Sequence, residues 1–229
     1  MSKFDHVMRH FINHTEENYL KAIYSLTEQS EKGVSTNSIA KILNTKASSV
    51  TEMMKKLSDK ELVSYKKYYG VELTNKGRTI ALTTIRKHRL WEVFLVDQLN
   101  FNWDEVHEIA EQLEHIQSEE LTNRLDDFLG NPKFDPHGDP IPNSKGKIED
   151  HRKKTTLSEL NDGAVSTLVG VSDSSSLFLQ HLEKRNLKLG TTIEIVNHFE
   201  FDRSLSILVN GSEQNISQRV ADNLIVQPK

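Results

Sequence analysis

The chain has 229 residues, of which 36% are hydrophobic and 27% charged, and it contains no cysteine. This balance is typical of a globular protein with two or three small domains. The lack of cysteine excludes disulfides and thiolate metal sites, and it favours a cytoplasmic location. No apolar run reaches the roughly 18 residues of a membrane span, and residues 1–20 lack the apolar core expected of a secretory signal.

The net charge of −4 is unevenly distributed along the chain. Residues 1–90 carry 16 basic and 9 acidic side chains, residues 91–150 carry 4 and 15, and residues 151–229 carry 9 of each. A basic segment suits a polyanion such as DNA, whereas an acidic segment suits cations. Chance clustering of charge is the alternative explanation.

Three short helices and a hairpin are predicted in the basic segment. By apolar spacing and turn residues, the helices cover about residues 15–29, 35–43 and 47–58, and the strands cover 62–65 and 71–73. Two short helices joined by a tight turn and followed by a small hairpin are typical of a winged helix-turn-helix. A purely structural three-helix bundle is the alternative, but the concentration of basic charge favours DNA binding.

In a winged helix, the helix after the turn enters the major groove of DNA, which is about 12 Å wide. Polar and basic residues at the start of that helix and in the wing would then reach bases or phosphates. These candidates are Lys46, Ala47, Ser48, Ser49, Thr51, Glu52, Lys55, Lys66 and Lys67.

The stretch VHEIAEQLEH, residues 106–115, gathers histidines and carboxylates in the acidic segment. On a helix predicted over residues 103–116, one side carries His107, Glu111, Glu114 and His115. A solvated helix face, a catalytic site or a metal site would each give this pattern. The zinc-protease motif H-E-x-x-H is absent, because the residue four positions after His107 is Glu111.

Two further clusters in the same region favour the metal site. His88 and Glu92 lie one helical turn apart on a long helix predicted from about residue 74 to 98, and Asp135 and His137 flank a proline. Crowded like charges repel, which is a physical reason for a cation. Carboxylates and imidazoles without thiolates suit Mn²⁺, Fe²⁺ or Zn²⁺. The sequence contains neither a nucleophile motif nor a phosphate-binding loop, so these patterns give no indication of an enzyme.

The last third of the chain has a different pattern. Strands are predicted over residues 164–171, 192–196 and 205–209, the last before the hairpin signal Asn210–Gly211, and a short helix over 174–185. Several short strands around one helix predict a small β-barrel.

Six motifs spread over nearly the whole chain resemble those of the diphtheria toxin repressor family of iron- and manganese-dependent regulators. They are NYLKAIYSL at 18–26, SSVTEMMKKL at 48–57, YYGVELTNKGR at 68–78, RKHRLWEVFL at 86–95, VHEIAEQLEH at 106–115 and DPHGDPIP at 135–142. The resemblance implies a mainly α fold with small β parts: a winged helix-turn-helix over residues 1–78, a helical metal-binding and dimerisation domain over 79–145, a linker over 146–155, and an SH3-like β-barrel over 156–229.

The resemblance also implies roles for the clustered residues. Glu111, Glu114 and His115 would form the site that drives activation, and His88, Glu92 and His107 a neighbouring site. Loop ligands would be Asp135 and His137, with Asp173 contributed by the SH3-like domain. The family usually has Asp or Met before the first tyrosine of the first helix, whereas this chain has Asn18, so either Asn18 or Glu17 would be the ligand there.

The function implied is a transcriptional regulator, a repressor of metal-uptake genes that binds palindromic operator DNA as a homodimer when loaded with metal. Glu111 stands where iron-sensing members have cysteine, which favours Mn²⁺ over Fe²⁺, while Zn²⁺ would bind tightly in vitro. No membrane, small-molecule substrate or enzymatic activity is expected. The alternatives are a winged-helix protein whose metal is purely structural, and a dinuclear metal hydrolase.

In the proposed mechanism, metal joins the first helix to the segment bearing Glu111 and His115. Two winged helices of a dimer would then match half-sites about 34 Å apart. The apolar residues expected either in the dimer interface or in the core of one chain are Trp91, Phe94, Leu95, Phe101 and Leu125.

Overall fold

The computed structural model of the chain describes residues 12–28, 33–66 and 70–229. Contacts divide the chain into two compact units, each of which is described by itself. The first unit comprises Met1–His88, Leu113–Glu119 and Pro142–Lys147. The second unit comprises Arg89–Gln112, Glu120–Ile141 and Ile148–Lys229.

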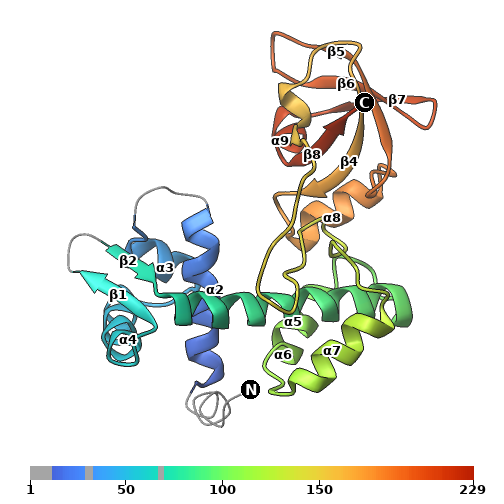
Figure 1. The fold of residues 1–229 in the computed structure, drawn as a ribbon. Helices are drawn as coiled ribbons and strands as arrows, with labels where there is room; N and C mark the ends of the chain where they lie inside the picture. The colour runs from blue at the N-terminus through green and yellow to red at the C-terminus, as the bar shows by residue number, and fades with distance from the viewer. Residues whose placement is uncertain (1–11, 29–32, 67–69) are drawn as a thin grey trace. The chain divides into compact units, whose positions relative to one another are not determined.

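Within the described residues, the first unit contains the start of the long helix Asn75–Leu99, preceded by three complete helices and a two-stranded hairpin (Figure 1). In chain order they are α2 (His14–Glu28), α3 (Thr36–Ile42), α4 (Ala47–Asp59), β1 (Val63–Lys66) and β2 (Gly70–Leu73). The Ser35 hydroxyl accepts a hydrogen bond from the Ser38 N–H at 3.0 Å and so caps α3. The predicted winged helix-turn-helix is therefore confirmed within the described residues.

A shared apolar core holds these elements together. The side chains of Leu20, Ile23, Ile39, Met54 and Leu57 are fully buried. The hairpin is tied to the chain before α3 by paired backbone hydrogen bonds between Val34 and Val71, of 3.0 and 2.9 Å. Burial of such side chains stabilises the unit by about 1.5–3 kcal/mol each, before the loss of conformational entropy is counted.

Three further helices follow in the chain: α5 (Asn75–Leu99), α6 (Val106–Leu113) and α7 (Glu119–Phe128). The prediction for α6 was wrong at both ends, because that helix was expected over residues 103–116. It ends at Leu113, and Glu114 and His115 lie in the turn that follows. The Ile116 N–H donates to the Leu113 carbonyl at 3.2 Å, a tighter turn than an α-helix makes.

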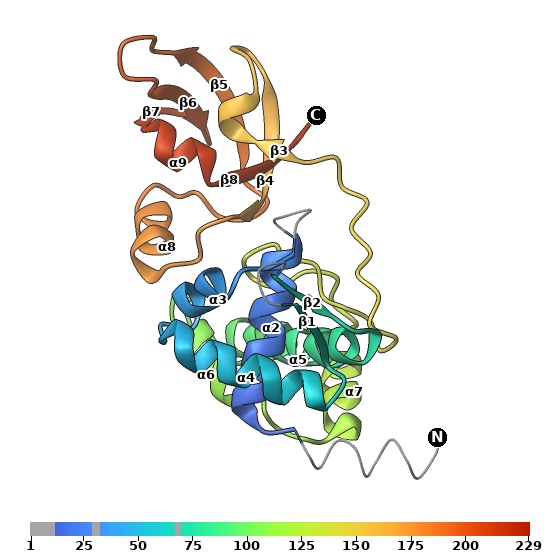
Figure 2. The same cartoon turned by 90° about the vertical axis from the view of Figure 1, so that its left-hand side faces the viewer.

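The second unit contains a six-stranded antiparallel sheet, seen at the top of Figure 1 and from the side in Figure 2, with the order β3-β8-β4-β5-β6-β7. Its strands are β3 (Thr155–Thr156), β4 (Val165–Val171), β5 (Thr192–His198), β6 (Leu205–Val209), β7 (Ser212–Ile216) and β8 (Leu224–Pro228). A 3-10 turn η1 (Leu157–Glu159) and the helices α8 (Ser176–Glu183) and α9 (Gln218–Asp222) accompany them.

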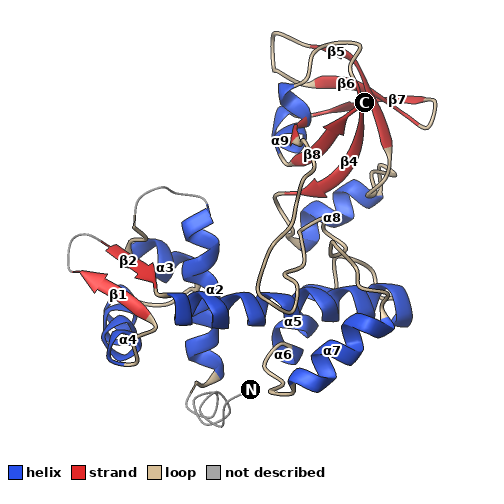
Figure 3. Cartoon of the chain, viewed as in Figure 1, coloured by secondary structure: helices blue, strands red, loops and turns tan. Residues whose placement is uncertain are grey.

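The predicted strands β4, β5 and β6 and the helix α8 are confirmed, as is the overall class of helical domains followed by a β-rich domain (Figure 3). Among the described elements of this unit, β3, η1, β7, α9 and β8 were not predicted from the sequence. The strand β7, SEQNI, shows why, since it is mostly polar and exposed at the edge of the sheet. Its register follows instead from the Asn210–Gly211 turn, both of whose residues have positive φ.

Apolar residues of the second unit divide between core and surface. Leu95 and Leu125 are buried, and Trp91 and Phe94 pack partly buried against the cluster that contains Leu125. Phe101 is 37% exposed. In the described part of the chain, no helix is both long enough and apolar enough to cross a membrane.

Gly77, near the start of α5, gives a test of the first unit's packing. A Cβ atom at this position would lie 2.0 Å from the Leu62 carbonyl oxygen, a backbone atom that cannot move aside cheaply. We expect Gly77→Ala to lower the free energy of unfolding of this unit by about 3 kcal/mol, measured by chemical denaturation. Thr79→Ala, at an exposed position of the same helix, is the matched control. Equal stability of the two variants would contradict the packing described here.

Candidate metal centre

Glu114 is the most deeply buried carboxylate of the predicted metal ligands, with no exposed surface. The Lys21 ammonium donates to both of its oxygens at 2.8 Å, and His88 Nδ1 lies 2.6 Å from Oε2. Burial raises the pKa of Glu114, but the hydrogen bond from His88 and the Lys21 charge outweigh burial and lower it. Glu114 is therefore held as a carboxylate inside the first unit.

His115 is oriented by a carboxylate from α2. Its Nδ1 lies 2.6 Å from Glu17 Oε2, while the other oxygen of Glu17 accepts from Gln117 Nε2 at 2.8 Å. The second ring nitrogen, Nε2, lies 3.9 Å from Glu114 Oε1. A carboxylate on one nitrogen of a histidine, with the other nitrogen turned toward further ligands, is the usual arrangement behind a metal-bound imidazole.

Asn18 on α2 tests whether the site fits an ion. Its side-chain oxygen, Oδ1, is buried and has no hydrogen-bond partner within the described residues. Leaving such an atom unsatisfied costs about 1–3 kcal/mol. An amide oxygen is a hard donor that suits Mn²⁺ or Fe²⁺. The orphaned oxygen therefore fits a metal ligand, whereas both oxygens of the neighbouring Glu17 are engaged by His115 and Gln117.

A second cluster lies wholly within the second unit. One ligand atom each from Glu92, Asp135 and His137 can be chosen so that all lie within 4.8 Å of one another, and all three residues are buried. His137 Nδ1 lies 3.5 Å from Glu92 Oε2, and its Nε2 lies 2.8 Å from the Trp103 carbonyl oxygen. Arg89 Nε, at 3.4 Å from Asp135 Oδ2, supplies positive charge.

The electrostatics of this second cluster also suit a cation. Burial, and then the charges of Glu92 and Asp139, raise the pKa of Asp135 to about 7. Burial lowers the pKa of His137, but the hydrogen bond and charge of Glu92 outweigh it and raise that pKa to about 9. Both shifts mean that Asp135 and His137 retain protons because negative charge is concentrated where solvent is excluded. A divalent ion would compensate the same negative charge.

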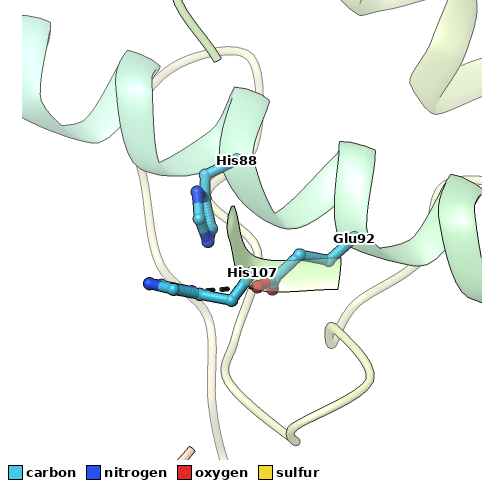
Figure 4. Close-up of side chains that lie close together, drawn as sticks. All are labelled: His88, Glu92 and His107. Atoms are coloured by element: carbon cyan, nitrogen blue, oxygen red, sulfur yellow. Dashed lines mark hydrogen bonds and ion pairs between the residues drawn. The ribbon is translucent and has the colours of Figure 1, made fainter. Parts of the chain in front are cut away.

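His88, Glu92 and His107 form a further group of converging side chains (Figure 4). His88 and Glu92 are one turn apart on α5, and His107 Nδ1 on α6 lies 3.4 Å from Glu92 Oε1. His107 Nε2 also lies 3.7 Å from Glu111 Oε1.

Asp173 belongs to none of these groups, although it was a predicted ligand. One of its oxygens, Oδ1, accepts the Ser175 N–H at 2.9 Å, immediately before α8. This position reflects a helix-start role, which Asp commonly fills. The structure therefore does not bring Asp173 together with Glu92, Asp135 and His137.

Arg152 braces the loop that carries Asp135 and His137, and it was missed in the sequence. Its guanidinium donates to the carbonyls of Val169 on β4 and Gly138 in the loop, at 2.9 and 2.8 Å, and stacks 3.5 Å from the centre of the Phe134 ring. It also pairs with Asp150 at 2.8 Å and holds the pKa of that carboxyl well below its usual range.

The backbone of the same loop lies directly on β4. The Val171 N–H donates to the His137 carbonyl at 3.0 Å. Gly138 has a φ of +89°, and a Cβ there would lie 2.1 Å from the Val169 carbonyl oxygen. Only glycine fits this approach, so the G of DPHGDP had a structural meaning that its sequence context did not reveal.

Most of the predicted DNA-contacting residues are exposed to solvent. The exposed ones are Lys46, Ala47, Ser48, Ser49, Glu52 and Lys55. Thr51 is half-buried, and its hydroxyl donates to the Ala47 carbonyl at 3.0 Å. The backbone of Lys66 ends β1, and Lys67 lies outside the described residues.

Three parts of the chain match models of known protein families. Residues 12–71 match the N-terminal DNA-binding domain of iron-dependent repressors, residues 74–143 match their metal-binding and dimerisation domain, and residues 155–228 match the FeoA domain. A manganese-dependent transcriptional repressor solved in complex with manganese is 34% identical, with a TM-score of 0.84 over 93% of this chain and 100% of that one. The chain belongs to the diphtheria toxin repressor family.

Other members of the diphtheria toxin repressor family show the extent of the likeness. The manganese regulator SloR is 37% identical, with a TM-score of 0.74 over 93% of this chain and 98% of that one. The diphtheria toxin repressor of Corynebacterium glutamicum is 27% identical over 93% of this chain and 96% of its own length. IdeR of Mycobacterium tuberculosis is 38% identical over 128 residues, and that match spans only 55% of IdeR. The family consists of metal-dependent transcriptional repressors that respond to manganese or iron, not of enzymes.

Arg152→Met tests the brace on the ligand loop. The substitution keeps the apolar stem but removes the donors to Gly138 and Val169, which should cost about 1–3 kcal/mol and speed amide hydrogen exchange at Val171. Exchange would be followed residue by residue by mass spectrometry or NMR. Lys154→Met removes only an exposed ion pair with Asp150 and is the matched control. Unchanged exchange at Val171 in the Arg152 variant would contradict the brace.

Proposed function

We propose that the protein is a cytoplasmic repressor that binds operator DNA as a homodimer when it is loaded with Mn²⁺ or Fe²⁺. One observation carries the proposal: α2 of the winged helix contacts the turn that bears two predicted ligands. Glu17 holds His115, and Lys21 holds Glu114. An ion at this turn would therefore act directly on a helix of the DNA-binding unit.

The ligand sets proposed from the family resemblance agree with several of these contacts. The activation site would use Glu111, Glu114 and His115 with the orphaned oxygen of Asn18. Glu17 is then an outer residue that orients His115 rather than a ligand. A bound divalent ion would supply positive charge that draws carboxylates and imidazoles from separate segments to one point.

A second set of ligands would occupy the neighbouring clusters. His88, Glu92 and His107 form one proposed site, and Asp135 and His137 extend it through Glu92, which reaches both histidines 107 and 137. Asp173 remains a proposed ligand of this set. Its present contact with Ser175 is a single hydrogen bond that a rotamer change would release.

Manganese is the favoured signal, with iron second. All the proposed donors are oxygen or imidazole nitrogen, and no soft thiolate is present to favour a softer ion. One related chain has been solved in complex with manganese, and the relative ScaR with Zn²⁺ and with Cd²⁺. Because affinity rises along the Irving–Williams series, tight binding of Zn²⁺ in vitro would not identify the ion that acts in cells.

The exposed start of α4 and the wing are the proposed DNA-contacting surface. Lys46 and Lys55 would meet phosphates, together with Lys66 and Lys67 of the wing, and Ser48 and Ser49 would face base edges. Support comes from the exposure of the helix residues and from the match of residues 12–71 to a DNA-binding domain. Phosphate contacts would make the affinity strongly dependent on salt.

DNA binding by the chelator-stripped chain tests the whole proposal. A labelled operator fragment from upstream of metal-transport genes would be titrated at fixed salt with Mn²⁺, anaerobic Fe²⁺ or Zn²⁺. We expect Mn²⁺ or Fe²⁺ to raise the affinity, and a chelator to reverse the gain. Affinity that is equal with and without metal would favour the alternative, a DNA-binding protein whose metal is only structural.

Substitution of two proposed ligands gives a sharper prediction. Glu111→Ala and His115→Ala should each abolish the metal-dependent gain in DNA affinity while leaving far-UV circular dichroism unchanged, because neither side chain is part of an apolar core. Glu108→Ala removes an exposed carboxylate from the same helix that belongs to no group of candidate ligands, and it is the matched control. A full metal response in both ligand variants would refute the site assignment.

The proposed dimer interface involves α7 and the end of α5. Leu121 and Phe128 on α7 are 40% and 65% exposed, and the Phe128 ring lies 6.3 Å from that of Phe94 on α5. Large exposed apolar side chains that gather on one surface mark an interaction site. The match of residues 74–143 to a dimerisation domain supports this surface as the partner of a second copy.

Phe128→Asp should convert the dimer to a monomer, because it introduces a charge into the apolar surface without disturbing a buried side chain. The change in mass would be measured by sedimentation velocity at several protein concentrations. Phe201→Asp, at a fully exposed phenylalanine between β5 and β6, is the matched control and should leave the dimer intact. A Phe128 variant that sediments as a dimer would exclude this surface.

A further inference from the structure

We propose that Lys21 is a built-in counter-ion of the activation site and that a divalent metal must displace it from Glu114. This inference rests on the proposed function, since it concerns the ligand Glu114. It adds a residue that sets how much metal is needed, although Lys21 would not itself bind the ion.

The ammonium group of Lys21 contacts the whole carboxylate of Glu114. Its Nζ lies 2.8 Å from both oxygens of Glu114, and the two side chains are 18% and 0% exposed. Glu114 is also 2.6 Å from His88 Nδ1 through Oε2. Both oxygens that an ion would use are thus already matched by donors within the protein.

A buried carboxylate needs such a partner, because an unpaired buried charge is strongly unfavourable. A divalent ion satisfies the same need more strongly. The two cations cannot share Glu114 cheaply, because like charges close together in a partly dry site repel. Metal binding therefore requires the Lys21–Glu114 ion pair to break. The free energy that this pair contributes reduces the net free energy of metal binding by the same amount.

Two further features of α2 favour Lys21 in its competition with a metal ion for Glu114. Asn18, three residues before Lys21 on α2, provides a neutral donor where a carboxylate would have added charge to attract the ion. The Lys21 side chain retains some exposure and a flexible stem, so its ammonium can move into water once it is displaced. The site is thereby set to respond at a higher metal concentration than its carboxylates alone would require.

Another ion pair of the first unit supplies a control. Glu16 is also fully buried, and it is paired with Lys60 at 2.7 Å and with Lys56 at 3.0 Å. None of these residues belongs to a group of candidate metal ligands. The two pairs are alike in burial and distance, but only the pair of Lys21 includes a proposed ligand.

The experiment measures Mn²⁺ binding by isothermal titration calorimetry to the full, chelator-stripped chain at fixed pH and salt. A His137→Ala background weakens the cluster of Glu92, Asp135 and His137, so that the activation site dominates the titration. In this background, Lys21→Met should bind Mn²⁺ about tenfold or more tightly than the parent. Lys21→Arg should remain close to the parent because it keeps the charge, and Lys60→Met should not change Mn²⁺ affinity.

A second measurement uses the unsubstituted protein, in case Lys21→Met does not fold. Acylation of the Lys21 amine, followed by mass spectrometry, should be slow without metal and several-fold faster with saturating Mn²⁺, with Lys60 as the internal reference. Mn²⁺ affinity that is unchanged or weaker in Lys21→Met would overturn the inference, as would an acylation rate at Lys21 that does not respond to metal. A parent chain that binds neither Mn²⁺ nor Fe²⁺ would instead overturn the proposed function, and this inference with it.

Discussion

Burial of carboxylates is the constraint on which the candidate metal centre depends. Glu114 and Glu92 are almost completely buried, and the protein must compensate each charge from its own side chains. Lys21 and His88 do so at Glu114, and His137 and His107 do so at Glu92. Segments that are far apart in the sequence are held together by these pairs, so the same contacts that stabilise the fold also form the candidate ligand sets.

This use of charge explains why α2 has two roles. Its apolar residues Leu20 and Ile23 enter the core of the winged helix, while Glu17 and Lys21, one turn apart, reach the turn after α6. A helix that shares one side with the DNA-binding core and another with candidate ligands couples the two physically. By linkage, any metal that binds this turn more tightly in the DNA-bound form must also tighten DNA binding by the same factor.

The periodic helices, the wing and the central strands were predictable, because apolar spacing and turn residues determine them locally. The clusters His88–Glu92, His107–Glu111 and Asp135–His137 were also visible as short spacings of ligand residue types. Lys21 and Arg152 were not, since a single basic residue in a charged chain carries no local signal. Their roles come from contacts with residues 93 and 17 positions away, respectively. The end of α6 was misplaced because apolar periodicity continued to Ile116, while buried contacts of Glu114 drew the chain into a turn.

The close approach of the Asp135–His137 loop to β4 has a consequence for dissecting the protein by truncation. Gly138, the His137 carbonyl and Arg152 all engage backbone groups of β4. A shortened chain that stops near residue 150 would lose Arg152 and the strand together, and its ligand loop would be left without a template. Loss of metal response in such a fragment would then report a disordered loop, not a missing sensor in the deleted part. Point substitutions on β4 are the cleaner tool for assigning a role to the C-terminal domain.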